Sequence, residues 1–364
     1  MNMKIYVFGT RGFPNIQGGV ESHCEKLYSS MPKDINITIF RRKPYINNNI
    51  ESINPSNINF IDLPSTKIKG FEAFFHSFIS TLVCIFKRPD IVHIHNIGPG
   101  IFTPILRLFK IKVVLTYHSS NYEHNKWNKF AKKILKLGEF FSLKFSNHII
   151  FVNKDKLNQF PFEIRNKATF IPNGMQRLLP AENNKIISSF GLKEFKYILS
   201  VGRITEEKGF EYLIDAYIES NIQYPLVIAG GIDHNSKYAN MLLEKSKLFP
   251  NIIFTGFAQG ETLRQLYTFA KVFVLASYNE GYPIVLLEAI NYNKSILASD
   301  ISANKQIPLP EECYFKDGNK DALKEKLKKE INNPTTSICY NIPILNWDDV
   351  ANQVVSIYKN LYGS

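Results

Sequence analysis

The sequence predicts an α/β protein built from two doubly wound domains, each around a parallel sheet. Short β-rich runs alternate with helical patterns along most of the chain, which is typical of parallel strands joined by crossover helices. The alternation stops once, in an irregular segment at 175–192 that contains Pro180 and two asparagines, and then begins again. A length of 364 residues is too great for one ordinary core, so we expect about two domains.

The predicted elements follow in order along the chain. The first domain begins with a strand at 4–8 and a helix near 19–31, and its further strands are expected at 35–40, 91–95, 113–117, 149–152 and 169–171. The second domain has predicted strands at 197–201, 226–229, 252–254, 272–275 and 295–298. The segment 175–192 is interpreted as an interdomain linker. We therefore place the domains at 1–180 and 181–346, with a final amphipathic helix at 347–364 packing back on the first.

Several classes of protein are disfavoured by composition. The first apolar stretch is short and runs into Gly9, so no signal peptide is expected. The longest, 71–86, contains charged and polar residues and falls short of the ~20 residues that a membrane span needs. Four scattered cysteines argue against disulfides and against a structural zinc site. We expect a cytoplasmic protein, peripheral at the inner face of the cell membrane.

The net charge of +12 is concentrated in the first half of the chain. Before residue 191 there are 26 basic and 12 acidic residues, and afterwards 18 and 20, so the two parts carry +14 and −2. This asymmetry indicates an anionic partner, whether nucleic acid, a phospholipid surface or a phosphorylated substrate. Basic residues interleave with aromatic ones at 67–75 and 126–133, which favours a lipid-facing surface, although a solvated helix face has the same pattern.

The most informative motif is a pair of carboxylates, Glu280 and Glu288. Glu288 interrupts the apolar run 284–290, and we expect it to be buried beside a partner rich in hydrogen-bond donors, such as a vicinal diol. Between the two carboxylates, Gly281, Tyr282 and Pro283 suit a turn into a helix whose first amides can bind an anion. The pair could therefore bracket a sugar nucleotide.

Two loops that follow predicted strands have the residues of a diphosphate site. The first, 9–21, contains Gly18 and Gly19, whose missing side chains let backbone amides approach a phosphate, and Arg11, which could supply charge. It has neither the dinucleotide nor the P-loop spacing. The second places Arg203 and Lys208 five positions apart after Gly202, a fork and a point charge that suit a diphosphate. Either loop could also be an ordinary surface turn.

Histidines follow two other predicted strands. His118 ends the strand at 113–117, where it could donate to a sugar hydroxyl, or serve only in packing. His93 and His95 lie on one face of a strand, but no third ligand is evident near them, so we interpret them as packing or polar lining rather than as a metal site. The chain has no Asp-x-Asp sequence. A metal-bridged diphosphate is therefore disfavoured, and we expect no metal and no cofactor.

Together these motifs resemble those of the GT-B glycosyltransferases, specifically family four of the retaining enzymes. The resemblance covers nearly the whole chain and is most specific at 277–283, Glu288 and 299–300. The opening, 9–14 with 18–21, is similar to a bacterial polysaccharide subgroup that includes rhamnosyltransferases. The chain departs from the family at 303–307, which lacks the usual Pro-Glu. The resemblance implies two Rossmann-like domains that face a central cleft.

The resemblance also implies roles for single residues. Glu280 would contact the donor sugar, Glu288 would hold the ribose, and Arg203 and Lys208 would bind the diphosphate. Gly18 and Gly19 would close over the phosphates, and His118 would lie near the transferred sugar. We expect further donor contacts from Gly202, Phe257, Gly281, Tyr282 and Pro283, and acceptor contacts from Arg11, Glu123 and Trp127.

The implied reaction is a metal-independent sugar transfer that retains the anomeric configuration. The donor would be a UDP-, dTDP- or GDP-sugar, and the acceptor a glycan or a polyprenyl-diphosphate-linked saccharide. The anionic membrane would bind the basic first half, and no nucleic acid partner is expected, because no zinc-finger or RNA-binding signature is present. Two alternatives stay open: a sugar-nucleotide epimerase of the same architecture, and a protein that binds sugar nucleotides without catalysis.

Overall fold

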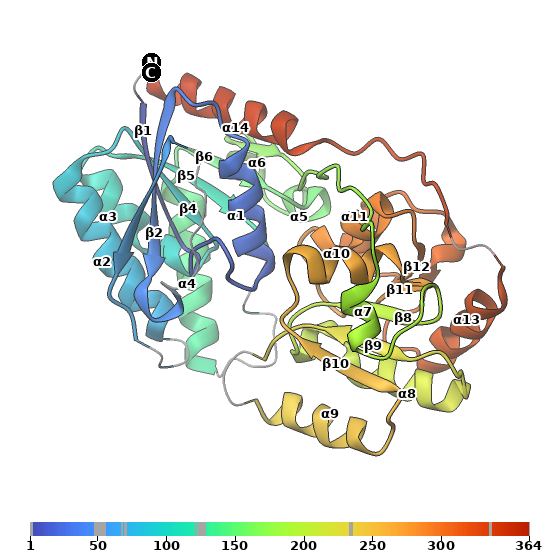
Figure 1. Cartoon of the computed structure of the whole chain (residues 1–364). Helices are drawn as coiled ribbons and strands as arrows, with labels where there is room; N and C mark the ends of the chain where they lie inside the picture. The colour runs from blue at the N-terminus through green and yellow to red at the C-terminus, as the bar shows by residue number, and fades with distance from the viewer. Residues whose placement is uncertain are drawn as a thin grey trace. The chain divides into compact units, whose positions relative to one another are not determined.

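The computed structural model describes residues 3–46, 56–66, 68, 71–120, 122, 129–232, 236–334 and 337–363. The chain divides into two compact units (Figure 1). Unit 1 comprises Met1–Gly174 with Leu345–Ser364, and unit 2 comprises Met175–Ile344.

Unit 1 is built on a parallel sheet that has seven strands among the described residues, in the order β3-β2-β1-β4-β5-β6-β7. The strands are β1 (Met3–Phe8), β2 (Ile35–Arg42), β3 (Ile58–Leu63), β4 (Ile91–His95), β5 (Lys112–Tyr117), β6 (His148–Phe151) and β7 (Ala168–Phe170). Its helices are α1 (Gly19–Ser29), α2 (Phe71–Lys87), α3 (Thr103–Leu108), α4 (Lys129–Phe145), α5 (Lys154–Asn158), α6 (Phe162–Arg165) and α14 (Trp347–Tyr362), with short 3-10 turns η1 (Lys43–Tyr45) and η2 (Pro99–Phe102).

Unit 2 repeats this plan with six strands in its described part, in the order β10-β9-β8-β11-β12-β13, again all parallel. The strands are β8 (Ile198–Val201), β9 (Leu226–Ala229), β10 (Ile252–Gly256), β11 (Val272–Leu275), β12 (Ser295–Ser299) and β13 (Tyr314–Phe315). Its helices are α7 (Lys185–Ser189), α8 (Phe210–Ser220), α9 (Lys237–Lys247), α10 (Gly260–Thr268), α11 (Ile284–Asn291), α12 (Ser302–Lys305) and α13 (Lys320–Asn332), with 3-10 turns η4 (Glu206–Lys208) and η5 (Glu311–Cys313).

The predicted strands are all present, with ends that shift by at most two residues, and the prediction of two doubly wound α/β domains is confirmed. Central strands such as β9 and β11 are buried along their whole length, which is why they are continuous apolar runs in the sequence. The sequence analysis did not predict β3 and β13, which are edge strands. The middle of β3 is partly exposed and β13 has only two residues, so neither is a continuous buried apolar run.

The segment predicted as an interdomain linker is part of unit 2. It contains α7, and Ile187 and Leu192 are buried in a core cluster that also contains Leu199 and Leu266. The Oε1 atom of buried Gln265 accepts from the backbone N–H of Ile186 at 2.9 Å. The interpretation as a linker is wrong because two apolar side chains fix this segment to the core.

The last helix, α14, belongs to unit 1 and lies beside α1 (Figure 1). Asn346 caps its start, accepting from the backbone N–H of Asp349 at 2.8 Å. The buried face repeats at helical spacing through Trp347, Val350 and Val354 to Tyr358. The hydroxyl of Tyr358 forms a hydrogen bond with Nδ1 of His93 on β4, at 2.5 Å.

We predict that Gly230→Ala destabilises the protein, because Gly230 follows β9 where the backbone of β8 approaches closely. A Cβ atom there would lie 1.7 Å from the carbonyl oxygen of Gly202. The overpacking should lower the free energy of unfolding by about 1–3 kcal/mol, measured by denaturant titration. Gly202→Ala is the matched control, since its Cβ would meet only the Lys208 side chain, at an ordinary 3.5 Å. Equal stability of the two variants would contradict the prediction.

A second prediction concerns His76 on α2, whose pKa burial lowers to about 3, with Arg42 contributing. The unfolded chain takes up a proton near the ordinary pKa of 6.5, whereas the folded chain does not. This contribution to stability is therefore present above the ordinary pKa and is lost as the pH falls through the window between the two values. From about pH 7.5 to pH 5.5 the loss should be about 1.4 kcal/mol. His76→Leu should show a correspondingly weaker decline in denaturant titrations at both pH values, and an unchanged decline would contradict the assignment.

Candidate functional site

The strand order of unit 2 reverses between β8 and β11, which are neighbours in the sheet. In open parallel sheets, ligands bind beyond the carboxyl ends of the strands at such a reversal, because the two following helices leave in opposite directions. Gly202 and Arg203 follow β8, and Ser277 and Glu280 follow β11. The candidate site in unit 2 is therefore formed by these two loops.

An ion pair joins the two loops. Nζ of Lys208 lies 2.5 Å from Oε1 of Glu280, and the Ser277 hydroxyl donates to the same oxygen at 2.6 Å. The side chains of Lys208 and Glu280 are 17% and 11% exposed, so the pair is partly shielded from water but within reach of a ligand. The sequence analysis proposed both ionic residues separately, and the structure brings them together. It did not single out Ser277.

Backbone contacts also fix the two loops to each other. Gly209 ends the turn η4 in the left-handed region at φ 63°, and a Cβ there would lie 2.1 Å from the carbonyl oxygen of Ala276. The N–H of Tyr278 donates to the Glu207 carbonyl at 2.9 Å. Nη2 of Arg203 lies 4.0 Å from Oε1 of Glu207, and its side chain is 29% exposed. Arg203 is therefore partly accessible to an anion.

Glu288 differs from its prediction. It is partly exposed rather than buried, on the same side of α11 as the partly exposed Val285, while Leu286, Leu287 and Ala289 are buried. Burial raises the pKa of the neighbouring Tyr267, and the Glu288 carboxylate adds to this effect. Glu288 thus stands at the edge of the apolar helix face, where water screens its charge, and a buried position would have required stronger pairing.

The other residues predicted to bind the donor follow strands of the same sheet. Pro283 is the residue before α11, and Gly281 and Tyr282 lie just ahead of it, partly exposed. Burial raises the pKa of Tyr282 to about 12. Gly202 packs against the Lys208 side chain. Phe257 follows the edge strand β10 and is 44% exposed.

The glycine loop of unit 1 lies between β1 and α1. Gly18 precedes the helix at φ 155°, and a Cβ there would lie 1.9 Å from Oε2 of Glu21. The other carboxylate oxygen of Glu21 accepts from the backbone N–H of Arg11 at 3.0 Å. A Cβ on Gly19 would meet nothing within 4 Å. Arg11 is partly exposed, and its guanidinium carbon lies 4.9 Å from the centre of the Tyr45 ring. Glu123 and Trp127, predicted on the acceptor side, lie outside the described residues.

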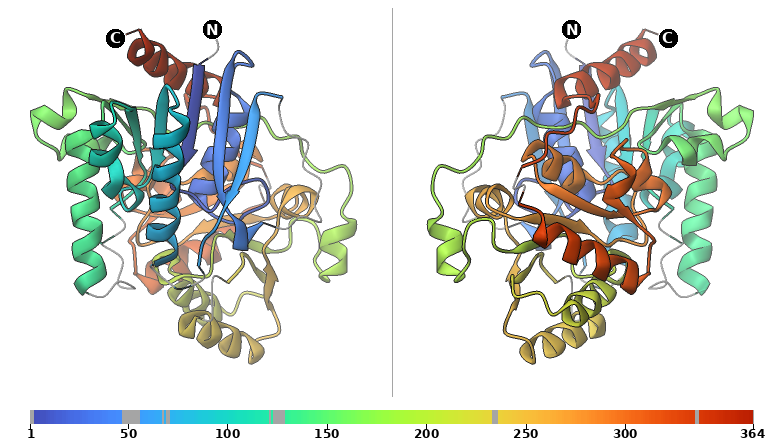
Figure 2. Two further views of the ribbon diagram at one scale, coloured as in Figure 1. Left: turned by 90° about the vertical axis from the view of Figure 1, so that its left-hand side faces the viewer. Right: turned by 90° about the vertical axis from the view of Figure 1, so that its right-hand side faces the viewer.

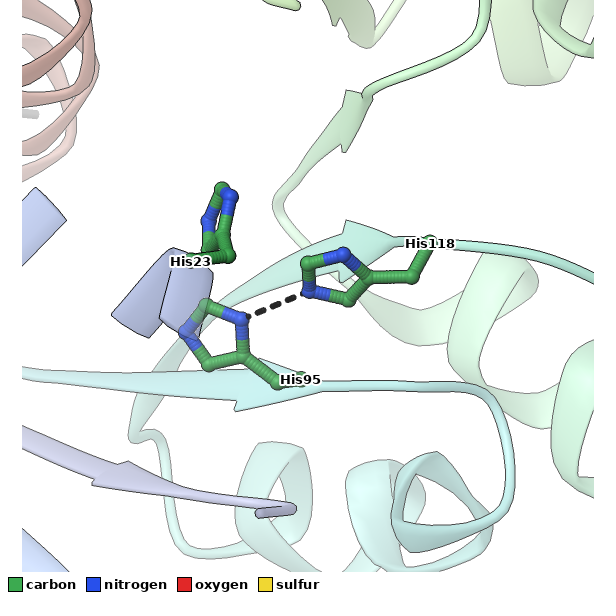
Figure 3. A group of neighbouring side chains, drawn as sticks. All are labelled: His23, His95 and His118. Atoms are coloured by element: carbon green, nitrogen blue, oxygen red, sulfur yellow. Dashed lines mark hydrogen bonds between the residues drawn. The ribbon is translucent and has the colours of Figure 1, made fainter. Parts of the chain in front are cut away.

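His118 belongs to a cluster of buried histidines in unit 1 (Figure 3). Its Nε2 lies 3.0 Å from Nδ1 of His95, and its ring centre lies 4.7 Å from that of His23 on α1. His95 Nε2 is 2.8 Å from the hydroxyl of Tyr28, which also lies 3.0 Å from Nδ1 of His93. Burial lowers the pKa of His23 to about 4, and it also lowers the pKa values of His95 and His118 well below the ordinary value. All three are therefore neutral near pH 7.

The interpretation of His93 as polar lining fits its hydrogen bonds, since its Nε2 also lies 2.7 Å from the hydroxyl of Thr116. The expectation that no third ligand lies near the pair is wrong for His95. The structure adds what the strand pattern did not contain, because His23 and His118 both lie close to His95. His23 comes from a helix 72 positions earlier in the chain. Only the packing of α1 on the sheet brings it there.

Helix α2 has an apolar stripe on the surface of unit 1. Five of its large side chains, spaced at three or four residues, are 40–83% exposed: Phe71, Phe74, Phe78, Leu82 and Phe86. The neighbouring helix α4 adds exposed Phe130, Leu137 and Phe140 beside exposed Lys129, Lys133 and Lys136. Contacts through α3 and η2 join the two helices along one side of the sheet (Figure 2). No helix among the described residues has the length and apolarity needed to cross a bilayer.

Comparison with known families agrees with this architecture. Residues 17–176 match the model "Glycosyltransferase Family 4", and residues 182–339 match "Glycosyl transferases group 1". The chain therefore belongs to the GT-B glycosyltransferases of the family 4 type, and its two parallel-sheet units are the two Rossmann-like domains of that fold.

Among curated proteins, an uncharacterized glycosyltransferase of Methanocaldococcus jannaschii is 30% identical over 178 residues, which cover 45% of each chain. Alpha-galactosylglucosyldiacylglycerol synthase of Streptococcus pneumoniae is 28% identical over 182 residues, or 47% of each chain. O-antigen chain mannosyltransferase B of Escherichia coli is 22% identical over 192 residues, or 50% of each. These matches span about half the length of each relative.

Two solved structures share the fold over almost their whole length. Sucrose-phosphate synthase of Thermosynechococcus elongatus has a TM-score of 0.80 at 19% identity, with both chains fully covered. HepE of Anabaena has a TM-score of 0.72 at 14% identity, with 99% of this chain and 98% of that chain covered. At these identities the likeness establishes the fold alone.

Proposed function

We propose that the protein is a retaining glycosyltransferase that moves a sugar from a nucleoside-diphosphate sugar to a glycan or lipid-linked acceptor in bacterial surface polysaccharide synthesis. The observation that carries this proposal is the Lys208–Glu280 pair at the strand reversal of unit 2. A cation for the diphosphate and a carboxylate for sugar hydroxyls lie in contact there, and the partly exposed Arg203 follows the same strand as Lys208.

The chemistry proposed for these residues is electrostatic. When the bond between the sugar and the diphosphate breaks, negative charge grows on the leaving phosphate. Lys208, Arg203 and the first amides of α11 would stabilise this charge without a metal. Glu280 would accept hydrogen bonds from the transferred sugar, and Glu288, at the exposed edge of α11, from the ribose. The acceptor hydroxyl would approach from the face that the diphosphate leaves, and the departing phosphate oxygen would take its proton.

The comparisons support a nucleotide-sugar donor, since the HepE structure is a complex with UDP-glucose. The name of the Escherichia coli relative, an O-antigen chain mannosyltransferase, supports an acceptor in surface polysaccharide synthesis. We further propose a UDP-, dTDP- or GDP-linked donor, with rhamnose as the transferred sugar to test first. The alternative of an epimerase is less favoured, because both family models describe glycosyltransferases.

Lys208→Ala and Arg203→Ala should each lower turnover about a hundredfold, since one charged donor lost at a developing anion costs ~3 kcal/mol. The measurement is release of free nucleotide in the presence of donor and acceptor, after a screen of UDP-, dTDP- and GDP-sugars by thermal shift. Lys247→Ala, an exposed lysine of α9 paired with Glu244, is the matched control and should keep full activity. Near wild-type rates in both site variants would refute the proposed role.

The same assay separates the competing functions. A transferase releases nucleotide only when a glycan acceptor is added, whereas an epimerase converts the donor sugar without one. A binding protein without catalysis would show a thermal shift with the donor and no product. A gel shift with nucleic acid would reveal a different function of the basic first half.

We also propose that the stripe on α2 and the lysines of α4 bind the anionic inner face of the cell membrane, where a lipid-linked acceptor would be found. Binding to vesicles that contain anionic lipid should fall as salt rises. Reversing Lys129 and Lys133 to Glu should weaken binding more than tenfold, at ~1 kcal/mol per basic residue near the surface. The control, Lys193→Glu with Lys196→Glu on unit 2, should bind normally in flotation assays. The absence of wild-type flotation at low salt would overturn this proposal.

A further inference from the structure

The histidine cluster of unit 1 has the geometry of a metal site. In the described part of the chain, one group of three His, Cys, Asp or Glu residues could hold an ion, and it consists of His23, His95 and His118 (Figure 3). Each offers one ring nitrogen, and the three nitrogens lie within 4.8 Å of one another. Around a tetrahedral zinc ion with Zn–N distances of ~2.0–2.1 Å, such nitrogens are about 3.4 Å apart. Small rotations of the rings reach that spacing.

The clearest candidate ligand atom is Nε2 of His23. Its Nδ1 lies 2.6 Å from the amide oxygen of Asn173, so this nitrogen carries the proton, and Nε2 has the lone pair. Nε2 is buried and has no hydrogen-bond partner among the described residues. A buried acceptor without a partner is costly. The ring itself is 2% exposed, so bulk water does not solvate it, whereas a bound cation would satisfy the lone pair.

A second buried polar atom without a described partner lies beside the cluster. Nε1 of Trp347 is such an atom, and the Trp347 ring centre is 5.5 Å from that of His23. An indole N–H can only donate. Two buried polar atoms without described partners thus lie side by side here, and the lone pair of His23 is the one that a cation would satisfy.

The surrounding hydrogen bonds match those of metal-binding histidines, which donate their outer N–H to a fixed acceptor. For His23 this acceptor is the amide oxygen of Asn173, and for His95 it is the hydroxyl of Tyr28. The contact between His95 Nδ1 and His118 Nε2 needs one proton between them. On metal binding that proton moves to the outward nitrogen of its ring, and all three rings stay neutral.

We propose that His23, His95 and His118 bind one divalent transition-metal ion, with Zn²⁺ as the best match. Three neutral imidazoles suit zinc and its neighbours and are poor ligands for Mg²⁺ or Ca²⁺. His118 is the most exposed of the three, at 8%, and a water molecule would complete a tetrahedral site. The ion would tie α1 to the ends of β4 and β5. The three histidines belong to unit 1, whereas Arg203 and Lys208 belong to unit 2.

The test uses the full chain without a histidine tag, stripped with a chelator and titrated with Co²⁺. We expect one equivalent to produce the intense visible absorption of tetrahedral cobalt, without the near-ultraviolet thiolate band that cysteine ligands would add. Zn²⁺ should displace the cobalt signal and raise Tm. If the wild-type protein shows no cobalt absorption at stoichiometric metal, the proposal is overturned, and no variant is needed to decide this.

Variants then locate the site. His23→Gln and His118→Gln should each abolish the cobalt spectrum while retaining the wild-type circular dichroism. Asn173→Ala removes only the hydrogen bond that orients His23 and should weaken Zn²⁺ binding roughly 10–100-fold. His148→Gln is the matched control, because His148 starts β6 and bonds to Thr169 on β7, outside the cluster. This variant should bind one equivalent normally. Unchanged binding in the His23 and His118 variants would also overturn the proposal.

Discussion

Parallel strands joined by crossover helices deliver all their carboxyl ends to one edge of the sheet, and this constraint decides where the chemistry of both units lies. In unit 2 it brings the loop after β8 against the loop after β11, so that Lys208 meets Glu280 across 72 positions of sequence. In unit 1 it aligns the ends of β4 and β5, so that His95 meets His118. Neither pair could form if the strands ran antiparallel, because alternate strand ends would then lie at opposite edges.

Hydrogen bonds connect the polar groups at this edge of the unit 2 sheet. In unit 2, Ser277 and Lys208 both bind one oxygen of Glu280, and the serine is itself part of a buried network, since its carbonyl accepts from the Ser299 hydroxyl at 2.5 Å. Asn304 continues this network by donating to the Ser299 carbonyl at 2.9 Å. The segment 303–307 lacks the usual Pro-Glu of the family, and its Asn304 thus supports the loop that contains Glu280.

Unit 1 concentrates neutral polar groups in its interior instead. His93 contacts Tyr28, Tyr358 and Thr116, so the last helix of the chain contributes a hydroxyl to the same network as the strand ends. Burial lowers the pKa of His93 to about 3, which removes the charge that would otherwise make such a core unstable. The network connects residues near the cluster with α14, and it explains why the C-terminal segment returns to unit 1.

The sequence by itself determined the fold class, the central strands and the chemical types of the site residues. Buried parallel strands must be apolar runs, and loops at their ends must contain the glycines and charges that no core accepts. Packing decided three features that a local sequence pattern does not contain. These are the edge strands β3 and β13, the burial of the segment around α7 in the core, and the partial exposure of Glu288. Only the tertiary structure decided which groups meet. The contact of Lys208 with Glu280 depends on the strand order of unit 2. The contacts of His23 with His95 and His118 depend on how α1 packs on the sheet of unit 1. Both are long-range properties of the folded chain.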